Sequence, residues 1–156
     1  MQNINQEKLF FDYDQIDYHN TNIAESKVMD FYKTKAKSEI DSIKKWVIIG
    51  SIPRTINDTL FLSKLDEISF FHNNIDTAKF SKINKIFVEK QTNENIALSC
   101  EPVYRDILIF RNKSRIVGIA KICFGCMQYQ IIGTTANTEN FGQDGDFGRL
   151  KELLPK

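Results

Sequence analysis

Residues 103–111, Val-Tyr-Arg-Asp-Ile-Leu-Ile-Phe-Arg, decide the fold, because the centre of this stretch is apolar on both faces of a strand. A strand that is covered on both faces has such a continuous apolar run, so we expect an inner strand of a sheet here. A turn at 112–114 leads into a second strand at 116–124, and a corner at 123–126 leads into a third at 128–132. Strands joined by such short turns form an antiparallel meander.

Before the meander, the apolar residues recur with helical spacing, except in the first stretch. Residues 11–18 alternate loosely and are rich in aromatic side chains, which favours an opening strand at the edge of the sheet. Asn22 with Glu25 resembles a capping box at a helix start, and Gly50 is placed to end a helix in the left-handed conformation. The expected helices begin near Asn22, Ser38, Asp58 and Ser81, the last two covering about 58–68 and 81–89. After a loop at 133–145, we expect Asp146 to cap a final helix.

Helices that precede strands, without alternation of the two, predict an α+β fold. We expect an N-terminal strand and helices, then an antiparallel β-meander, then a C-terminal helix. With 156 residues, of which 42% are hydrophobic, the chain predicts a single domain over 1–156.

Composition excludes several classes of protein. The longest apolar runs are four residues, at 46–49 and 107–110, and a membrane span needs about 20. A net charge of +1 argues against a binder of nucleic acid, whose affinity rests on surplus cations.

The first residues have neither a basic region nor an apolar stretch, so we expect a cytoplasmic protein, with export after removal of a leader as the alternative.

The most specific signal is Cys123-x-x-Cys126, with Cys100 upstream. A redox pair needs its first cysteine at a helix N-terminus, and here strand-like residues flank the motif. A zinc site needs four ligands, so Cys100 and a distant His19 or His72 would have to complete it. The third interpretation, which we favour, is that the cysteines are buried apolar side chains or that Cys100 bridges to one of the pair.

The predicted hairpin also indicates where Cys100 lies. Cys100 comes just before the strand at 103–111, and Cys123 ends the strand paired with it. We therefore expect Cys100 to lie near Cys123 or Cys126, and a Cα separation above about 7 Å to both would exclude a bridge.

Four further groups of polar residues could form a site. Tyr104, Arg105 and Asp106 lie at the start of the inner strand, where alternation would place Tyr104 and Asp106 on one face. An anion-binding or catalytic arginine is one interpretation, and a charge that anchors the strand's end is the favoured one. Asp12 and Asp14 form the second group, and we favour guards of an edge strand over a hydrolytic pair. The third is the oxygen-rich loop 140–146, for which we favour a helix-capping loop over a calcium loop. The fourth is His19 and His72, which are isolated in the sequence.

Charge is unevenly distributed along the chain. Residues 1–30 hold six acidic and two basic residues, and residues 31–54 hold six basic and two acidic residues. Such a dipolar surface can orient a protein partner, or the two segments can pack together and neutralise each other. The two outcomes are equally compatible with the sequence.

The sequence contains no recognisable catalytic set, which favours a non-enzymatic protein over an enzyme. We expect a small binding protein with a protein partner and no cofactor, such as an immunity-type protein or inhibitor of a bacterium. The alternative is a thiol- or zinc-dependent protein that uses Cys100, Cys123 and Cys126. A hydrolase that uses the Asp12 and Asp14 face comes third.

Overall fold

The computed structural model describes residues 7–91 and 99–156. A five-stranded antiparallel sheet in the order β2-β1-β3-β4-β5 forms its centre. The chain order is β1 (Gln15–Asn20), α1 (Glu25–Lys33), α2 (Glu39–Ile48), α3 (Thr59–Lys64), β2 (Phe71–Asn74), the 3-10 turn η1 (Thr77–Lys79), α4 (Phe80–Asn84), β3 (Asp106–Asn112), β4 (Arg115–Cys123), β5 (Gln128–Ile132) and α5 (Asp146–Leu153). This order confirms the predicted α+β fold with its meander and last helix. Within the two described ranges, no helix has the length and apolar character that a membrane crossing requires.

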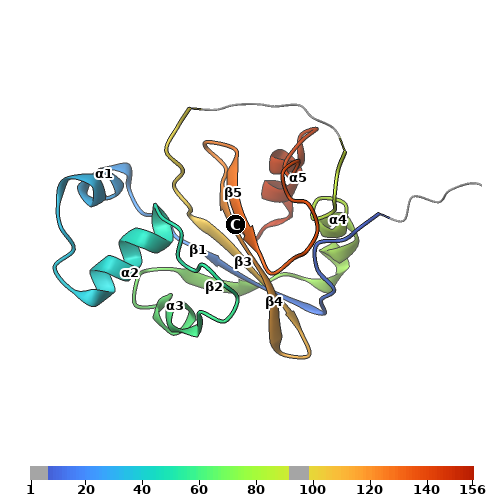
Figure 1. The fold of residues 1–156 in the computed structure, drawn as a ribbon, viewed down its shortest axis with the longest axis horizontal. Helices are drawn as coiled ribbons and strands as arrows, with labels where there is room; N and C mark the ends of the chain where they lie inside the picture. The colour runs from blue at the N-terminus through green and yellow to red at the C-terminus, as the bar shows by residue number, and fades with distance from the viewer. Residues whose placement is uncertain (1–6, 92–98) are drawn as a thin grey trace, which may run out of the picture.

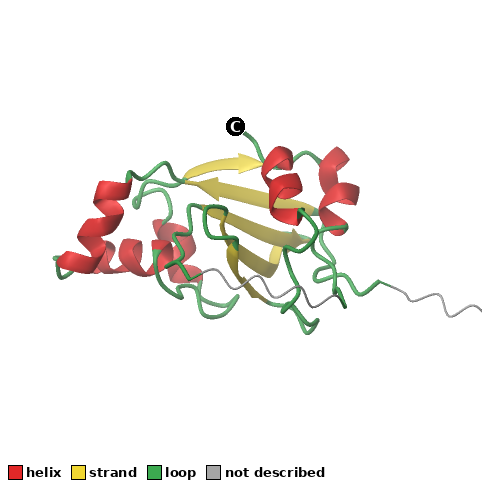
Figure 2. Cartoon of the chain, turned by 90° about the horizontal axis from the view of Figure 1, so that it is seen from above, coloured by secondary structure: helices red, strands yellow, loops and turns green. Residues whose placement is uncertain are grey.

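β3 is buried on both faces, as its apolar centre predicts. Ile107 and Ile109 belong to a cluster with apolar residues of α2 and α3, whereas Leu108 and Phe110 belong to a cluster with residues of α4 and α5. Figures 1 and 2 show the corresponding arrangement, with the sheet between α1, α2 and α3 at one end and α4 and α5 at the other. The sheet therefore separates two cores.

The prediction that the opening strand lies at the edge of the sheet is wrong. β1 starts later than expected, at Gln15, and pairs with β3 on one side and with β2 on the other. All four residues of β2, Phe-His-Asn-Asn, are exposed, so this strand carries no periodic apolar signal. Because β2 gives no such signal in the sequence, the sequence predicts only one neighbouring strand for β1 in the sheet.

Helix starts and ends follow the sequence signals only in part. The Ser38 hydroxyl accepts a hydrogen bond from the Asp41 N–H at 3.2 Å, which confirms the expected start of α2. The capping box at Asn22 is wrong, since Ala24 precedes α1 and caps it with no side-chain bond. Gly50 is not in the left-handed conformation; its constraint is the Trp46 ring, whose Cε3 would lie 2.5 Å from an added Cβ.

The helices expected over 58–68 and 81–89 are shorter in the structure. α3 and α4 end early, and the residues after them continue as turns that still bury Ile68, Ile86 and Phe87. A turn can direct an apolar side chain into the core as well as a helix can, so the spacing of apolar residues overestimates helix length. The loop 140–146 leads into a helix, but the expected capping by Asp146 is wrong, because Asp146 is the first residue of α5 and Gly145 at the N-cap provides no side-chain bond. The loop is held instead by Asn140, whose Nδ2 donates to the Lys90 carbonyl at 2.8 Å.

Candidate functional site

The three cysteines gather where β4 ends and β5 begins. Cys100 and Cys126 form a disulfide with their Cα atoms 6.1 Å apart. This separation is below the limit of about 7 Å for a bridge, and it confirms that Cys100 lies near the cysteine motif. Cys123 is the last residue of β4; its thiol is free and buried, and its Sγ accepts a hydrogen bond from the Val103 N–H at 3.4 Å. The two cysteines of the motif therefore have different environments.

This geometry bears on the redox and zinc interpretations. Cys123 closes a strand and Cys126 lies in the turn that leads into β5, so neither is at a helix N-terminus, where a thiol pKa would be lowered. Two of the three sulfurs bond to each other, and bonded sulfurs are not thiolate ligands. In the described ranges, no group of three or more His, Cys, Asp or Glu side chains is placed to hold a metal ion. The thiol- or zinc-dependent alternative stays a prediction.

Tyr104 and Asp106 contact opposite faces of the sheet, contrary to the sequence expectation. The Tyr104 ring lies on the α2 side with its centroid 4.6 Å from Lys121 Nζ, whereas Asp106 accepts a hydrogen bond from Tyr18 on the α5 side. The reason is that Tyr104 precedes β3, which begins only at Asp106, so strand alternation does not apply to it. Arg105 turns toward the start of α1, donating to the Ile23 carbonyl at 3.2 Å and to Glu25 at 3.1 Å.

Lys121 is a buried cation near the end of β4. Its side chain is fully buried, and Nζ donates to the carbonyls of Gly50 and Ile52, both at 2.8 Å. Burial lowers the pKa of Lys121 to about 7, because an ammonium loses hydration in the core. The sequence gives no sign of this contact, since Lys121 lies in an apolar strand and its acceptors are main-chain atoms at the end of α2.

His19 and His72, isolated in the sequence, lie opposite each other on β1 and β2. Their rings stack with centroids 4.7 Å apart. His72 Nε2 lies 3.5 Å from an Asp17 carboxylate oxygen, and Arg111 Nε lies 2.6 Å from the other oxygen of the same carboxylate. Burial, followed by the neighbouring His72, lowers the pKa of His19 to about 4. This group was not predicted because the pairing of β1 with β2 creates it.

Asp12 and Asp14 do not guard a sheet edge and do not lie on a strand. They precede β1, where the Asp12 carbonyl accepts from Asn112 Nδ2 at 3.1 Å and the Asp14 carboxylate accepts from the Lys113 N–H at 3.0 Å. These bonds anchor the turn between β3 and β4. The edge-guard interpretation is therefore wrong, and the observed contacts are structural.

A pocket of about 450 Å³ lies beside the start of β3. Asp106 and Tyr18 line it together with three cations, Arg105, Lys151 and Lys156, and with apolar residues from before β3, after β4 and after α5. Burial raises the pKa of Asp106, while the Tyr18 hydroxyl and the Lys151 and Arg105 charges act in the opposite direction. Two of the three residues singled out from the sequence, Arg105 and Asp106, thus line one cavity.

A second hollow, of about 370 Å³, lies between α1 and α2. Its charged lining comprises two aspartates and five lysines, which we call the lysine surface: Lys27, Lys35, Lys37, Lys44 and Lys45. Throughout residues 7–91 and 99–156, none of these five lysines lies in an ion pair. Two acidic residues of the stretch 7–30 form ion pairs, and neither pairs with a lysine of this surface. Asp17 pairs with His72 of β2 and Arg111 of β3, and Glu25 pairs with Arg105, which precedes β3.

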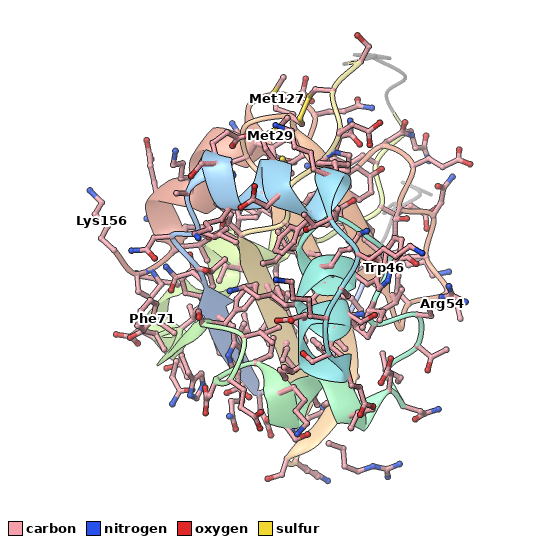
Figure 3. The ribbon with its side chains drawn as sticks, turned by 90° about the vertical axis from the view of Figure 1, so that its left-hand side faces the viewer. Met29, Trp46, Arg54, Phe71, Met127 and Lys156 are labelled. Carbon is pink, nitrogen blue, oxygen red and sulfur yellow. A yellow bond between two sulfur atoms is a disulfide. The ribbon has the colours of Figure 1, made fainter. Side chains whose placement is uncertain are left out.

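Exposed apolar side chains lie near the lysine surface. Figure 3 shows the side of the molecule that carries α1 and α2, with Met29 on α1 and Trp46 on α2. Trp46 is 46% exposed, and Lys45 Nζ lies 5.1 Å from the centroid of its ring. A cationic hollow next to an exposed aromatic ring is suited to contact with another macromolecule.

Comparison with known proteins gives no family. No family model, no curated protein and no solved structure matches the chain. The function is therefore argued from the residues and their geometry.

Proposed function

We propose that the protein is a small non-enzymatic binding protein that holds an acidic protein partner on its lysine surface. The observation that carries the proposal is the hollow between α1 and α2, where five lysines meet two aspartates. Because these five lysines outnumber the two aspartates and lie in no ion pair among residues 7–91 and 99–156, they leave a local positive field. Such a field attracts an acidic partner and speeds its encounter.

The charge pattern of the sequence supports this assignment. Residues 31–54 carry a net charge of +4, and in the described part of the chain no ion pair joins their bases to an acid of residues 7–30. Mutual neutralisation was the alternative to partner steering, and the observed ion pairs favour steering. The positive charge is local, since the whole chain has a net charge of only +1.

Trp46 is suited to anchor the partner. The ring lies against Gly50, where an added Cβ would meet it, and beside the Lys45 ammonium. An aromatic side chain that is already held in place loses little conformational entropy on binding. Tryptophan is also enriched among the residues that dominate interface energy.

A local basic patch could also attract nucleic acid, but the apolar part of the hollow favours a protein. The lining includes the side chains of Ile23 and Phe31, which a protein can cover with apolar groups and a phosphate backbone cannot. Protein interfaces combine such an apolar centre with a charged rim. An inhibitor or immunity-type protein of a bacterium, which blocks an enzyme by covering it, would use a surface of this kind.

The Cys100–Cys126 bridge supports the exported alternative for the compartment. Disulfides persist in oxidising compartments and are rare in the reducing cytosol. Alkylation of the protein in freshly lysed native cells, followed by mass measurement, tests this point. If the protein is unfolded without a reductant before alkylation, we expect one alkylated cysteine, the buried free Cys123. Three alkylated cysteines would instead support a cytoplasmic protein.

The binding proposal is tested by capture from native cells followed by a measured affinity. The tagged protein is used to isolate partners, each recovered partner is purified, and calorimetry gives its dissociation constant. Lys37→Glu/Lys44→Glu reverses two charges on the lysine surface, and Lys82→Glu/Lys85→Glu makes the same charge change near α4.

We expect the first variant to bind at least about tenfold more weakly than wild type, because reversed charges repel an acidic partner. The α4 variant serves as the matched control and keeps its affinity. Equal affinity of both variants would contradict the proposal. Capture of nucleic acid in place of protein, with a duplex DNA probe binding the wild type, would also contradict it.

A further inference from the structure

The pocket beside β3, which we call the Asp106 pocket, is lined by both apolar and charged side chains. Its walls include Val103, Phe124 and Leu154, from the segment before β3, the turn after β4 and the end of α5. The pocket has a volume of about 450 Å³, which is within the usual range for sites that hold small molecules. Asp106 and Tyr18 supply the polar groups on the α5 side of the sheet.

Asp106 gives the pocket a buried carboxylate, on which the nearby Lys151 and Arg105 charges act from beyond ion-pair distance. Asp106 accepts a hydrogen bond from the Tyr18 hydroxyl, and across the described ranges it lies in no ion pair. Burial raises the pKa of Asp106, which reports the cost of holding this charge away from water. A ligand with an ammonium group would compensate that charge.

Three cations line the same pocket: Arg105, Lys151 and Lys156. Arg105 is already held by Glu25 and the Ile23 carbonyl. Lys151 lies in no ion pair within the part of the chain that the structure describes, and its Nζ lies 5.9 Å from the centroid of the Phe124 ring. Because Lys151 lies beside this apolar wall, it is the group that we expect to receive an anionic part of a ligand.

We propose that the Asp106 pocket binds a free α-amino acid with an apolar side chain. The ligand's ammonium group would contact Asp106, its carboxylate would contact Lys151, and its side chain would lie against Val103, Phe124 and Leu154. A zwitterion of this kind offers a cation to Asp106 and an anion to Lys151 at once. Charge-assisted hydrogen bonds of this type are about twice as strong as neutral ones.

The amino-acid site does not depend on the proposed partner binding. The Asp106 pocket and the lysine surface share no lining residue. Variants of Lys37 and Lys44 therefore test the partner, and variants of Asp106 and Lys151 test the amino acid. Either proposal can fail while the other stands.

The test is calorimetric titration of the full chain with L-leucine, L-methionine and L-phenylalanine. N-acetyl-leucine lacks the ammonium charge and leucinamide lacks the carboxylate, so these two compounds are matched controls. We expect saturable binding of at least one free amino acid and at least about tenfold weaker binding of both controls, because each control leaves one charge of the pocket unpaired. Absence of saturable binding in the millimolar range, or equal binding of the blocked compounds, would overturn the proposal.

Two variants then assign the contacts. Lys151→Met keeps the aliphatic stem of an exposed side chain, so it should fold as the wild type does, and it should bind leucine and leucinamide equally. Asp106→Asn should bind leucine and N-acetyl-leucine equally. Lys113→Met, in the turn between β3 and β4, is the control and should leave all affinities unchanged. Unchanged discrimination in Lys151→Met would by itself contradict the assigned orientation, even if Asp106→Asn fails to fold.

Discussion

Lys121 shows how a single residue can make stability depend on pH. The ammonium lies in the core between two carbonyl oxygens and the Tyr104 ring, and these contacts favour its protonated form. Burial acts more strongly in the other direction and lowers the pKa of Lys121 to about 7. The unfolded chain, in contrast, keeps this proton up to its ordinary pKa of 10.5.

We predict that Lys121→Met reduces the rise of stability with pH. Between pH about 7 and about 9 the unfolded state binds more protons at this residue than the folded state, so the unfolding free energy of the wild type should increase with pH. The contribution is at most about 1.4 kcal/mol per pH unit. Urea unfolding of wild type and variant across this pH range measures the difference, and parallel curves would contradict the prediction.

The burial of Lys121 and the stacking of His19 on His72 could not be predicted from the sequence. Both depend on which residues the sheet brings together, and the partners lie 53 to 71 positions away along the chain. By contrast, the closeness of Cys100 to the cysteine motif could be predicted, because one hairpin connects them. The sequence did not indicate which of the two motif cysteines bonds to Cys100.

At the scale of elements, β4 is shaped by a glycine that lies against an aromatic ring. A Cβ added at Gly118 would lie 2.0 Å from Phe11 Cε1, and the register of β3 and β4 shifts just beyond this point. Gly148 in α5 is the opposite case, because nothing lies within 4 Å of an added Cβ. The two glycines therefore form a matched pair for substitution.

We expect Gly118→Ala to lower the unfolding free energy by about 1–3 kcal/mol, since the added methyl group overfills the core. Gly148→Ala should raise it by about 0.5–1 kcal/mol, because alanine is the better helix former. Chemical denaturation of the two variants tests both signs. A Gly118→Ala protein as stable as the wild type would show that Phe11 does not pack as described.

The disulfide joins the segment before β3 to the turn between β4 and β5. Its cysteines are 26 positions apart, and closing a loop of this length contributes about 3.5 kcal/mol in the chain-entropy model. We predict that Cys100→Ser lowers the unfolding free energy by about this amount under oxidising conditions. Adding a reductant should bring the wild type down to the variant, and a variant as stable as the oxidised wild type would contradict the prediction.

The meander could be predicted because its central strand is apolar on both faces and short turns separate its members. β2 was missed because all four of its residues are exposed, so the sequence has no period there to detect. Missing β2 also led to the wrong position for β1. Helix lengths were overestimated because the turns after α3 and α4 bury apolar residues at helical spacing.

At the scale of the whole molecule, the two proposed sites lie on different sides of the sheet. The α1 and α2 side carries the lysine surface and Trp46, and the α5 side carries the Asp106 pocket. The charge segments of the sequence anticipated the first feature. The second could not be anticipated, because Tyr18, Asp106 and Lys151 come from three elements that are far apart along the chain.

We predict that Trp46→Ala weakens partner binding by about 30-fold, the effect of losing about 2 kcal/mol at a central interface residue. Phe71→Ala removes another exposed aromatic ring, on β2 and outside the lysine surface, and should leave the affinity unchanged. Calorimetry with the purified partner compares the two variants. Similar losses in both would place the contact elsewhere.

Hydrogen–deuterium exchange of the full chain, with and without its captured partner, tests the central claim most directly. If an acidic protein occupies the lysine surface, amides of α1, α2 and the loop between them should exchange more slowly in the complex, and those of α4 and α5 should be unchanged. Slower exchange confined to α4 and α5, with α1 and α2 unaffected, would contradict the account.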